Sequence, residues 1–269
     1  MRVVVHLSDI HFGRLNPDTV TPLAAAIRRL RPDLLAVSGD LTQRARRREF
    51  RAARDFLDAL PCTRLVVPGN HDVPLYNVFT RFLTPLARYR RTITSDLSPV
   101  YRDDEMIVVG VNTARSLTWG EGRINSRQVE AVVAQLAGAP PDLIRIVVTH
   151  HPFDLPTGVA EARLLGRARA AMDHLSKAGA DLFLAGHLHI SHIGHTAERY
   201  RVGGHSALVV QAGTVSTRSR GEEPSFNVLR IERPRISVER LVWDAGRRDF
   251  AGSGESHYRR ADEGWIKAG

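Results

Sequence analysis

The chain is poor in cysteine and lysine and has no long apolar run. Cys62 is the only cysteine among the 269 residues, so an intramolecular disulfide and a thiolate metal cluster are both excluded. No stretch approaches the roughly 20 apolar residues that a membrane-spanning helix needs. The opening residues, MRVVVHLSD, lack the apolar core and cleavage site of a signal peptide. These absences lead us to expect a cytoplasmic protein.

The positive charge comes almost wholly from arginine. Lysine and arginine together number 38, against 29 acidic residues, which gives a formal net charge of +9, and Lys177 and Lys267 are the only lysines. A basic balance favours phosphate-bearing substrates, nucleic acid or an anionic membrane surface, and it selects none of them. The arginines are scattered rather than grouped into one stripe, so a nucleic-acid partner is not favoured.

The chain does have a repeated arrangement, in which a short apolar run ends in a polar cluster and a helix-like segment follows. The runs are RVVVHLSD, DLLAVSGD, RLVVPGNHD, IRIVVTHH and DLFLAGHLH. Continuous Val, Ile and Leu of this kind predict strands buried on both faces. The helical candidates are Thr19 to Leu30, Glu49 to Leu60, Ser126 to Leu136 and Arg167 to Ala178. Alternating strands and helices predict an α/β layered fold.

MIVVGVNT, residues 106–113, predicts one more strand. From residue 200 the pattern changes. The stretches YRVGGHSALVVQAGT, SFNVLRIER and RISVERLVWD predict antiparallel strands without helices between them. We interpret them as the second half of a two-sheet sandwich within a single domain, residues 1–246. Residues 247–269, rich in Gly, Ser and charge, are expected to form a loosely attached tail.

Polar side chains gather where these strands end. Ligands of α/β sheets bind outside the carboxyl ends of the strands, so residues distant in sequence are expected to meet there. Asp9 and His11 are two residues apart, as are His187 and His189, which points both members of each pair to one side of an extended segment. The predicted rim collects seven oxygen and nitrogen donors: Asp9, His11, Asp40, Asn70, His150, His187 and His189.

This donor set indicates a metal centre. Carboxylate, amide and imidazole ligands without sulfur suit Mn, Fe or Zn better than Cu(I) or an iron–sulfur cluster. Seven side chains are too many for one tetrahedral ion, and they suit two ions that share a bridging carboxylate. We therefore expect two divalent or mixed-valence metal ions as cofactors.

Five short motifs in a fixed order carry a resemblance to a known family. DIH, GDLT, GNHD, THH and GHLH resemble those of the calcineurin-like metallophosphoesterase superfamily, over roughly residues 3–215. The resemblance implies a two-sheet β-sandwich flanked by helices, with αββα layers. It also implies metal roles: Asp9, His11 and His189 would hold one ion, Asn70, His150 and His187 the other, and Asp40 would bridge them.

The same resemblance implies a reaction. Two metals about 3.5–4 Å apart would hold a hydroxide that attacks phosphorus and would neutralise the phosphoryl oxygens. His71 would protonate the leaving group or steady the transition state, and Asp72 would orient its ring. A structural role is the alternative for His71.

The remaining histidines are assigned lesser roles. His151 is expected to lie beside the ligands without binding metal, and His6 to be structural. His192 and His195 fall beyond the GHLH motif and are expected in a polar loop at the edge of the site or on the surface. Three more are treated as background: His174, His205 and His257.

Among subfamilies, the chain most resembles the class III cyclic nucleotide phosphodiesterases. The stretches SGDLTQRARRREFRAARDFLDAL and VNTARSLTWGEGRINSRQVEAVVAQL share the layout of that group. The expected partner is accordingly a phosphodiester substrate, a small nucleotide, with 3',5'-cyclic nucleotides as the leading choice. The sequence gives no sign of the oligomeric state.

A basic apolar segment leaves other substrates open. In residues 77–93, Phe79, Phe82, Leu83, Leu86 and Tyr89 recur at helical spacing among several arginines. An amphipathic helix packed on the domain is the preferred interpretation. A cap for a lipid substrate, as in a UDP-diacylglucosamine pyrophosphatase at a membrane surface, is the alternative. A DNA nuclease and a non-catalytic metal-binding scaffold are further alternatives.

Overall fold

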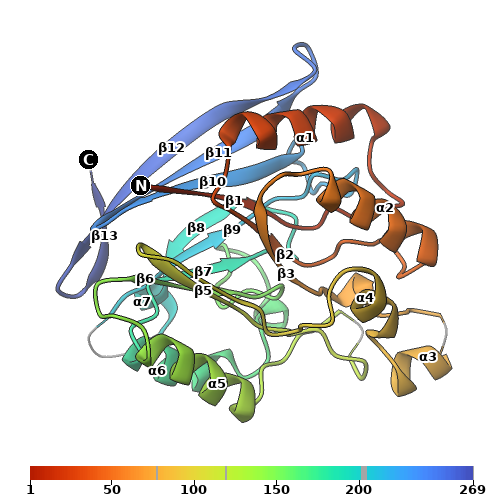
Figure 1. Cartoon of the computed structure of the whole chain (residues 1–269). Coiled ribbons are helices and arrows are strands. Elements are labelled where there is room, and N and C mark those ends of the chain that lie inside the picture. Colours follow the sequence, from red (N-terminus) through yellow and green to blue (C-terminus); the bar gives the residue numbers. More distant parts are fainter. Residues whose placement is uncertain (77, 119, 201–204, 269) are drawn as a thin grey trace.

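A computed structural model describes residues 1–76, 78–118, 120–200 and 205–268 (Figure 1). The strands are β1 (Arg2–Leu7), β2 (Leu34–Ser38), β3 (Thr63–Val67), β4 (Val100–Arg102), β5 (Met106–Gly110), β6 (Ile144–Val148), β7 (Leu182–Ala185), β8 (His192–His195), β9 (Leu208–Gln211), β10 (Ser225–Glu232), β11 (Arg235–Asp244), β12 (Asp249–Ala261) and β13 (Gly264–Ala268). The helices are α1 (Pro17–Leu30), α2 (Arg47–Asp58), α3 (Val78–Leu83), α4 (Ala87–Thr92), α5 (Ser126–Ala137), α6 (Ala168–Lys177) and α7 (Thr196–Arg199). Short 3₁₀ turns cover Asn70–Asp72 and Glu161–Arg163.

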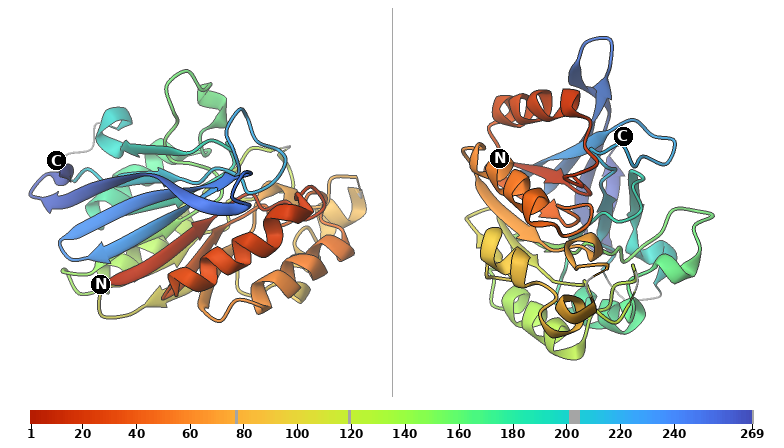
Figure 2. Two further views of the ribbon diagram at one scale, coloured as in Figure 1. Left: turned by 90° about the horizontal axis from the view of Figure 1, so that it is seen from above. Right: turned by 90° about the vertical axis from the view of Figure 1, so that its right-hand side faces the viewer.

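Two mixed sheets pack face to face. One has the strand order β13-β12-β11-β10-β1-β2-β3 and the other β4-β5-β6-β7-β9-β8. β1, β2 and β3 are parallel, as are β5, β6, β7 and β9, and antiparallel strands complete each sheet. Figure 2 shows α1 and α2 outside the first sheet and α5 and α6 outside the second. The predicted two-sheet sandwich flanked by helices is confirmed.

Three apolar layers hold this arrangement together. Side chains of one face of both sheets, from Val4 to Trp265, form the layer between them. A second layer joins the first sheet to α1 and α2, and a third joins the other sheet to α5 and α6. Every residue of Leu34–Ser38 is buried, which is what a strand covered on both faces requires. The core therefore fixes the strands whose carboxyl ends carry the polar side chains.

The predicted helices form at the expected places. α5 begins at Ser126 because the Asn125 side chain accepts a hydrogen bond from the backbone N–H of Gln128, while the Gln128 side chain accepts from Asn125 N–H. This reciprocal pair is a capping box. Asn16 caps α1 in a similar way, through Asp18 N–H.

The strands after residue 200 differ from the prediction in direction and place. β9 runs parallel to β7 inside the second sheet, and its four residues are all buried, as in other central parallel strands. β10 and β11 are antiparallel, but they extend the first sheet from β1. Residues 201–204 of the first stretch lie outside the described residues.

The expectation of a loose tail after residue 246 is wrong. β12 and β13 add two strands to the first sheet, and Phe250, Tyr258 and Trp265 are buried. Trp265 Nε1 donates to Asp181 Oδ1 at 3.0 Å, and Arg260 Nε donates to the same oxygen at 3.1 Å. Because Asp181 precedes β7, these bonds tie the end of the chain to the opposite sheet.

Residues 77–93 do not form one amphipathic helix. α3 and α4 are separate, with Pro85 between them. Tyr89 of α4 is buried and its hydroxyl donates to Val66 O at 3.0 Å. Phe79 and Leu83 of α3 are 79% and 77% exposed, so the α4 part of the apolar stripe packs on the domain and the α3 part does not. Residue 77 lies outside the described part of the chain.

Within the described ranges, no helix is long and apolar enough to cross a membrane.

Candidate metal centre

The seven predicted ligands converge on one rim from five separate loops. Asp9 and His11 follow β1, Asp40 follows β2, and Asn70 opens the 3₁₀ turn after β3. The other three follow β6 and β7: His150, His187 and His189. Parallel strands end at the same edge, which is why runs far apart in sequence deliver their polar ends to one place.

The backbone of the rim is held in an uncommon conformation. Five of the predicted ligands have positive φ: Asp9 (52°), His11 (51°), Asp40 (52°), His187 (72°) and His189 (58°). A non-glycine residue rarely adopts this region, and such strain tends to cluster at functional sites. The chain turns sharply after each strand and directs the side chains inward.

One cluster contains Asp9, His11, Asp40 and His189, all buried, with a potential ligand atom of each within 4.8 Å of the others. His189 Nε2 lies 3.1 Å from Asp9 Oδ1. His11 Nε2 lies 3.6 Å from the same oxygen and 3.7 Å from Asp40 Oδ2. Two carboxylates and two imidazoles thus face a common point.

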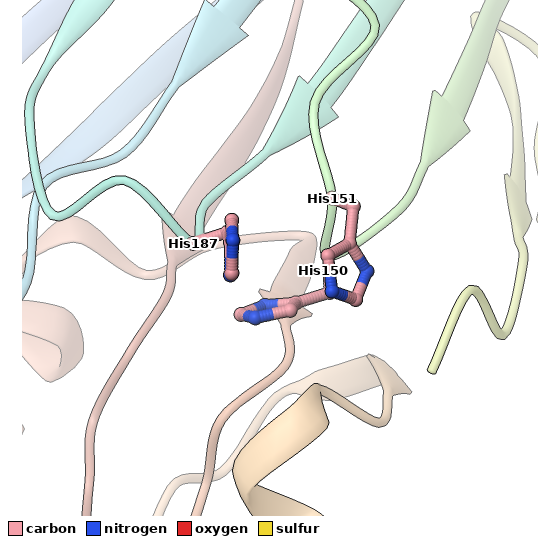
Figure 3. A group of neighbouring side chains, drawn as sticks. All are labelled: His150, His151 and His187. Atoms are coloured by element: carbon pink, nitrogen blue, oxygen red, sulfur yellow. The ribbon is translucent and has the colours of Figure 1, made fainter. Parts of the chain in front are cut away.

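A second cluster lies beside the first. His150 Nε2 is 3.0 Å from Asn70 Oδ1, and His187 Nδ1 is 3.1 Å from the same oxygen. Figure 3 shows the two rings beside each other; they meet edge to face, with centroids 5.1 Å apart. Asp40 Oδ2 lies 3.4 Å from His150 Nε2, so its carboxylate reaches both clusters.

Hydrogen bonds to the backbone orient three of the imidazoles. The Nδ1 atoms of His11, His150 and His189 lie 3.3, 2.8 and 2.7 Å from the carbonyl oxygens of Thr42, Ser38 and Arg218. A carbonyl only accepts, so each Nδ1 carries a proton and each Nε2 faces the centre, where it can bind a proton or a metal ion. Outer partners of this kind commonly orient metal-binding histidines.

Two observations fit a cation at this point. With both Nδ1 atoms bonded to carbonyls, the Nε2 atoms of His11 and His189 face each other at 3.1 Å, a contact that needs a proton or a metal ion between them. Asp9 Oδ2 accepts from Ser8 Oγ and His187 N–H, whereas Asp9 Oδ1 is buried and accepts no hydrogen bond from the described residues. The donor set also matches borderline and hard divalent metals.

The charges around Asp9 and Asp40 favour the ionised form of both carboxylates. Burial acts to raise the pKa of Asp9, but the adjacent imidazoles of His189 and His11 hold it well below its ordinary value. Burial is likewise outweighed at Asp40, where His150 and His71 lower the pKa. The same attraction overcomes burial at His150 and raises its pKa to about 9. Two ionised carboxylates in a buried site call for cationic partners.

His71 lies at the edge of the first cluster. Its ring meets that of His11 edge to face, at 4.9 Å between centroids. Nδ1 lies 2.9 Å from Gln43 O and so carries the proton. Its backbone N–H donates to Asp40 Oδ1 at 2.8 Å. Burial lowers the pKa of His71, so Nε2 is an acceptor directed at the site.

Asp72 does not orient the His71 ring, contrary to the expectation. Its carboxylate instead accepts from the backbone N–H groups of Leu41, Thr42 and Gly69, at 3.2, 2.9 and 3.0 Å. Burial and the charge of Asp40 raise the pKa of Asp72 to about 7. Asp72 therefore joins the loops that carry Asp40 and Asn70, and the carbonyl of Gln43 orients His71.

Sequence reasoning missed Arg218. Its Nη1 donates to His71 Nε2 at 2.9 Å and lies 3.3 Å from His11 Nε2, while its carbonyl holds His189. Arg218 follows β9, beyond the five motifs, and no spacing rule pointed to it. The structure places a half-buried guanidinium beside the first cluster.

Gly186 and Gly69 let their loops pack closely against the loops that carry Asp9 and Asp40. A Cβ on Gly186 would lie 1.7 Å from Ser8 Oγ and 2.4 Å from Asp9 Oδ2. A Cβ on Gly69 would lie 2.1 Å from Asp40 Oδ1. Any other residue at these two positions would displace a carboxylate of the centre.

His151 adjoins the second cluster, with both ring nitrogens already engaged. Nδ1 lies 2.8 Å from Thr113 Oγ1 and Nε2 lies 3.2 Å from Gly120 O. Because the carbonyl takes the Nε2 proton, Nδ1 accepts from the hydroxyl. Figure 3 shows this ring beside His150 and His187, where it is placed to support ligands.

The other histidines lie away from the two clusters. His6 is buried against Ser38 Oγ at 2.9 Å. His192 and His195 belong to the edge strand β8 rather than to a loop, and His192 lies 3.5 Å from Asp154. His205 bonds Asp181. His174 and His257 are exposed.

The sequence of this chain matches the model of a known protein family. Residues 2–191 match the model described as calcineurin-like phosphoesterase, and this span holds all seven predicted ligands. The chain belongs to the calcineurin-like phosphoesterase family. The match covers more than half of the chain, so the expected family is confirmed.

Two curated relatives of this phosphoesterase chain are phosphodiesterases by name. It is 29% identical over 172 residues to the glycerophosphodiester phosphodiesterase GpdQ of Enterobacter lignolyticus, covering 59% of each chain. It is 31% identical over 80 residues to a probable cyclic nucleotide phosphodiesterase of Synechococcus, covering 26% of this chain and 31% of that one. The match thus spans less than two thirds of either relative.

Among solved structures, a dimetal phosphatase from Danio rerio has the same fold. The TM-score is 0.66 at 14% identity, over 93% of this chain and 98% of the other. At this identity the likeness concerns the fold alone.

Proposed function

We propose that this phosphoesterase hydrolyses phosphodiesters with two metal ions bound at the rim. Asp9, His11 and His189 would hold one ion, Asn70, His150 and His187 the other, and Asp40 would bridge them. When bound, two such ions would neutralise the negative charge on the phosphoryl oxygens and activate a water molecule. Mn, Fe and Zn suit these ligands.

The observation that carries the proposal is the position of Asp40. Its Oδ2 lies 3.7 Å from His11 Nε2 in one cluster and 3.4 Å from His150 Nε2 in the other. A single carboxylate within reach of both ligand sets is what a dinuclear centre needs, and a single-ion site has no use for it.

The chain's own residues would bind and orient the substrate. His71 directs Nε2 at the site, and the neighbouring Arg218 guanidinium matches a phosphoryl group in charge and geometry. With Nδ1–H held by Gln43 O and Nε2 accepting from Arg218, His71 Nε2 is the atom that would take up a proton before passing it to a departing alkoxide.

The leading substrate class is the 3',5'-cyclic nucleotides. Support comes from the named activity of the Synechococcus relative and from the arginine-rich segment that follows Asp40. The longer match to GpdQ favours a second candidate, a glycerophosphodiester. Both are diesters with an alkoxide leaving group, so one centre serves either reaction.

The test is hydrolysis by metal-depleted protein after Mn²⁺ is restored. The substrates compared are bis-p-nitrophenyl phosphate, cyclic AMP, glycerophosphocholine, UDP-diacylglucosamine and single-stranded DNA. Turnover of the generic diester and cyclic AMP supports the proposal. If only UDP-diacylglucosamine or only DNA is hydrolysed, the substrate assignment is overturned. If none of the five substrates is hydrolysed by protein with metal bound, the result favours a scaffold.

A further inference from the structure

Exposed apolar side chains concentrate at one end of the molecule. Ten large apolar residues are exposed among those the structure describes, and six of them belong to α3 and its two neighbouring loops. We define these six as the α3 patch: Tyr76, Val78, Phe79, Phe82, Leu83 and Leu117. Exposed apolar side chains gathered in this way favour an interaction site.

α3 presents its apolar side to solvent and its polar side to the protein, which is the reverse of an ordinary surface helix. Four of its six residues are apolar and exposed, whereas Arg81 is 3% exposed. The Arg81 guanidinium donates to the carbonyls of Ser116, Pro74 and Thr118, at 2.8, 3.1 and 2.5 Å. These bonds hold the polar side of α3 inward, fix Leu117 beside it, and present the apolar side to solvent.

The surroundings of the patch are cationic. Residues 76–94 contain no Asp or Glu, and Arg90 and Arg91 of α4 are exposed. α4 packs on α2, since Arg54 Nη1 donates to Thr92 O at 3.2 Å. α2 and the loop before it add a set of exposed arginines: Arg46, Arg47, Arg48 and Arg51. Figure 1 shows α2, α4 and α3 gathered at the same end.

We infer that the α3 patch docks this protein on an anionic lipid surface. Apolar side chains that enter the headgroup region beside arginines that face anionic lipids are the combination that interfacial binding uses. A second copy of the chain fits less well, because a twofold contact sets the same patch against itself and brings the arginines together.

Docking would bring the metal centre close to the lipid surface. Arg81, beneath the patch, lines the same cavity of about 90 Å³ as Asn70 and His71. The inference concerns attachment and does not depend on which phosphodiester is hydrolysed, so vesicle binding tests it separately from activity.

The experiment is co-sedimentation of the full chain with sucrose-loaded vesicles of phosphatidylcholine alone or with 30% phosphatidylglycerol. The wild type should sediment with the anionic vesicles and stay in solution with the neutral ones. The double variant Phe79→Ser with Leu83→Ser should bind at least tenfold less. Its matched control is Val100→Ser with Ile266→Ser, which removes two exposed apolar residues elsewhere and should bind as the wild type does.

Two further arms separate charge and self-association. Arg90→Gln with Arg91→Gln should weaken anionic binding several-fold, and Arg127→Gln with Arg235→Gln, which changes net charge equally at other exposed positions, should not. Thermal unfolding checks that each variant is folded. The inference is overturned if the wild type ignores anionic vesicles, if patch and control variants bind alike, or if light scattering shows a dimer that the patch variant abolishes.

Discussion

The guanidinium of Arg218 lies 2.9 Å from Nε2 of His71, across a sequence separation of 147 residues. The two side chains come from the loops after β9 and β3, one from each sheet. Their contact joins a fixed positive charge to the imidazole that faces the centre. Arg218 lies outside the five sequence motifs, and the importance of its contact with His71 can be measured.

Replacing Arg218 by Gln should slow diester hydrolysis. Loss of a positive charge facing the phosphoryl group should cost about ten- to a hundredfold in kcat/KM. Metal content should stay the same, because the Arg218 carbonyl rather than its side chain holds His189. Steady-state kinetics with elemental analysis measures both. Arg220→Gln, an exposed neighbour, is the control, and an equal loss in both variants would refute the role of Arg218.

Replacing His71 by Ala should separate catalysis from metal binding. We expect full metal content and a loss of roughly 100- to 1,000-fold in rate. The loss should be larger for an alkyl leaving group than for p-nitrophenolate, which needs no proton. Kinetics with matched diesters tests this. Loss of metal in the variant would show that His71 is a ligand or supports one.

Gly186→Ala should damage the centre through its packing. The added Cβ would overlap Ser8 Oγ and Asp9 Oδ2, and overpacking of this kind costs about 1–3 kcal/mol of unfolding free energy. Denaturant unfolding and metal titration should both show the loss. Gly254→Ala, whose Cβ would meet nothing within 4 Å, is the control. A Gly186→Ala protein with normal stability and normal metal affinity would contradict the geometry.

Asp181 should stabilise the protein in a pH-dependent way. Burial acts to raise its pKa, but hydrogen bonds from His205 and Arg260 outweigh burial and lower it. Because the folded-state pKa is depressed, the stabilisation is complete above the unfolded value of about 3.9 and is lost as the pH falls through the folded pKa.

Asp181→Asn should therefore lower the unfolding free energy by about 2 kcal/mol at pH 7. The difference from the wild type should shrink as the pH falls below about 3.9. Urea unfolding at several pH values measures it, with Asp173→Asn, an exposed residue of α6, as the control. A cost that stays constant down to pH 2 would show that lost packing, not lost charge, is responsible.

The rim could be predicted because each ligand follows a buried apolar run directly. Once Leu34–Ser38 is recognised as a strand covered on both faces, Asp40 must lie at its carboxyl end, and the same reasoning applies to Asp9 and His150. The local pattern and the overall fold agree there. The ligands' left-handed conformations gave no signal, since positive φ is usual for glycine and not for aspartate or histidine.

The tail could not be predicted because its apolar residues are sparse. Phe250, Tyr258 and Trp265 are separated by glycine, serine and charge, which suggested a solvated segment. Asp181, from the opposite sheet, accepts hydrogen bonds from Arg260 and Trp265 of the tail. No local sequence pattern predicts a contact between such distant residues. For the same reason Arg218 and the inward-facing Arg81 were missed, because each is defined by contacts with distant loops.

The most direct test of the account is the number of Mn²⁺ ions that bind to metal-depleted protein, counted by isothermal titration calorimetry for the wild type and Asp40→Ala. The account predicts two ions per chain in the wild type, and loss of at least one in Asp40→Ala together with loss of diester hydrolysis. A wild type that binds one ion or none, or an Asp40→Ala protein that still binds two, would contradict the dinuclear centre.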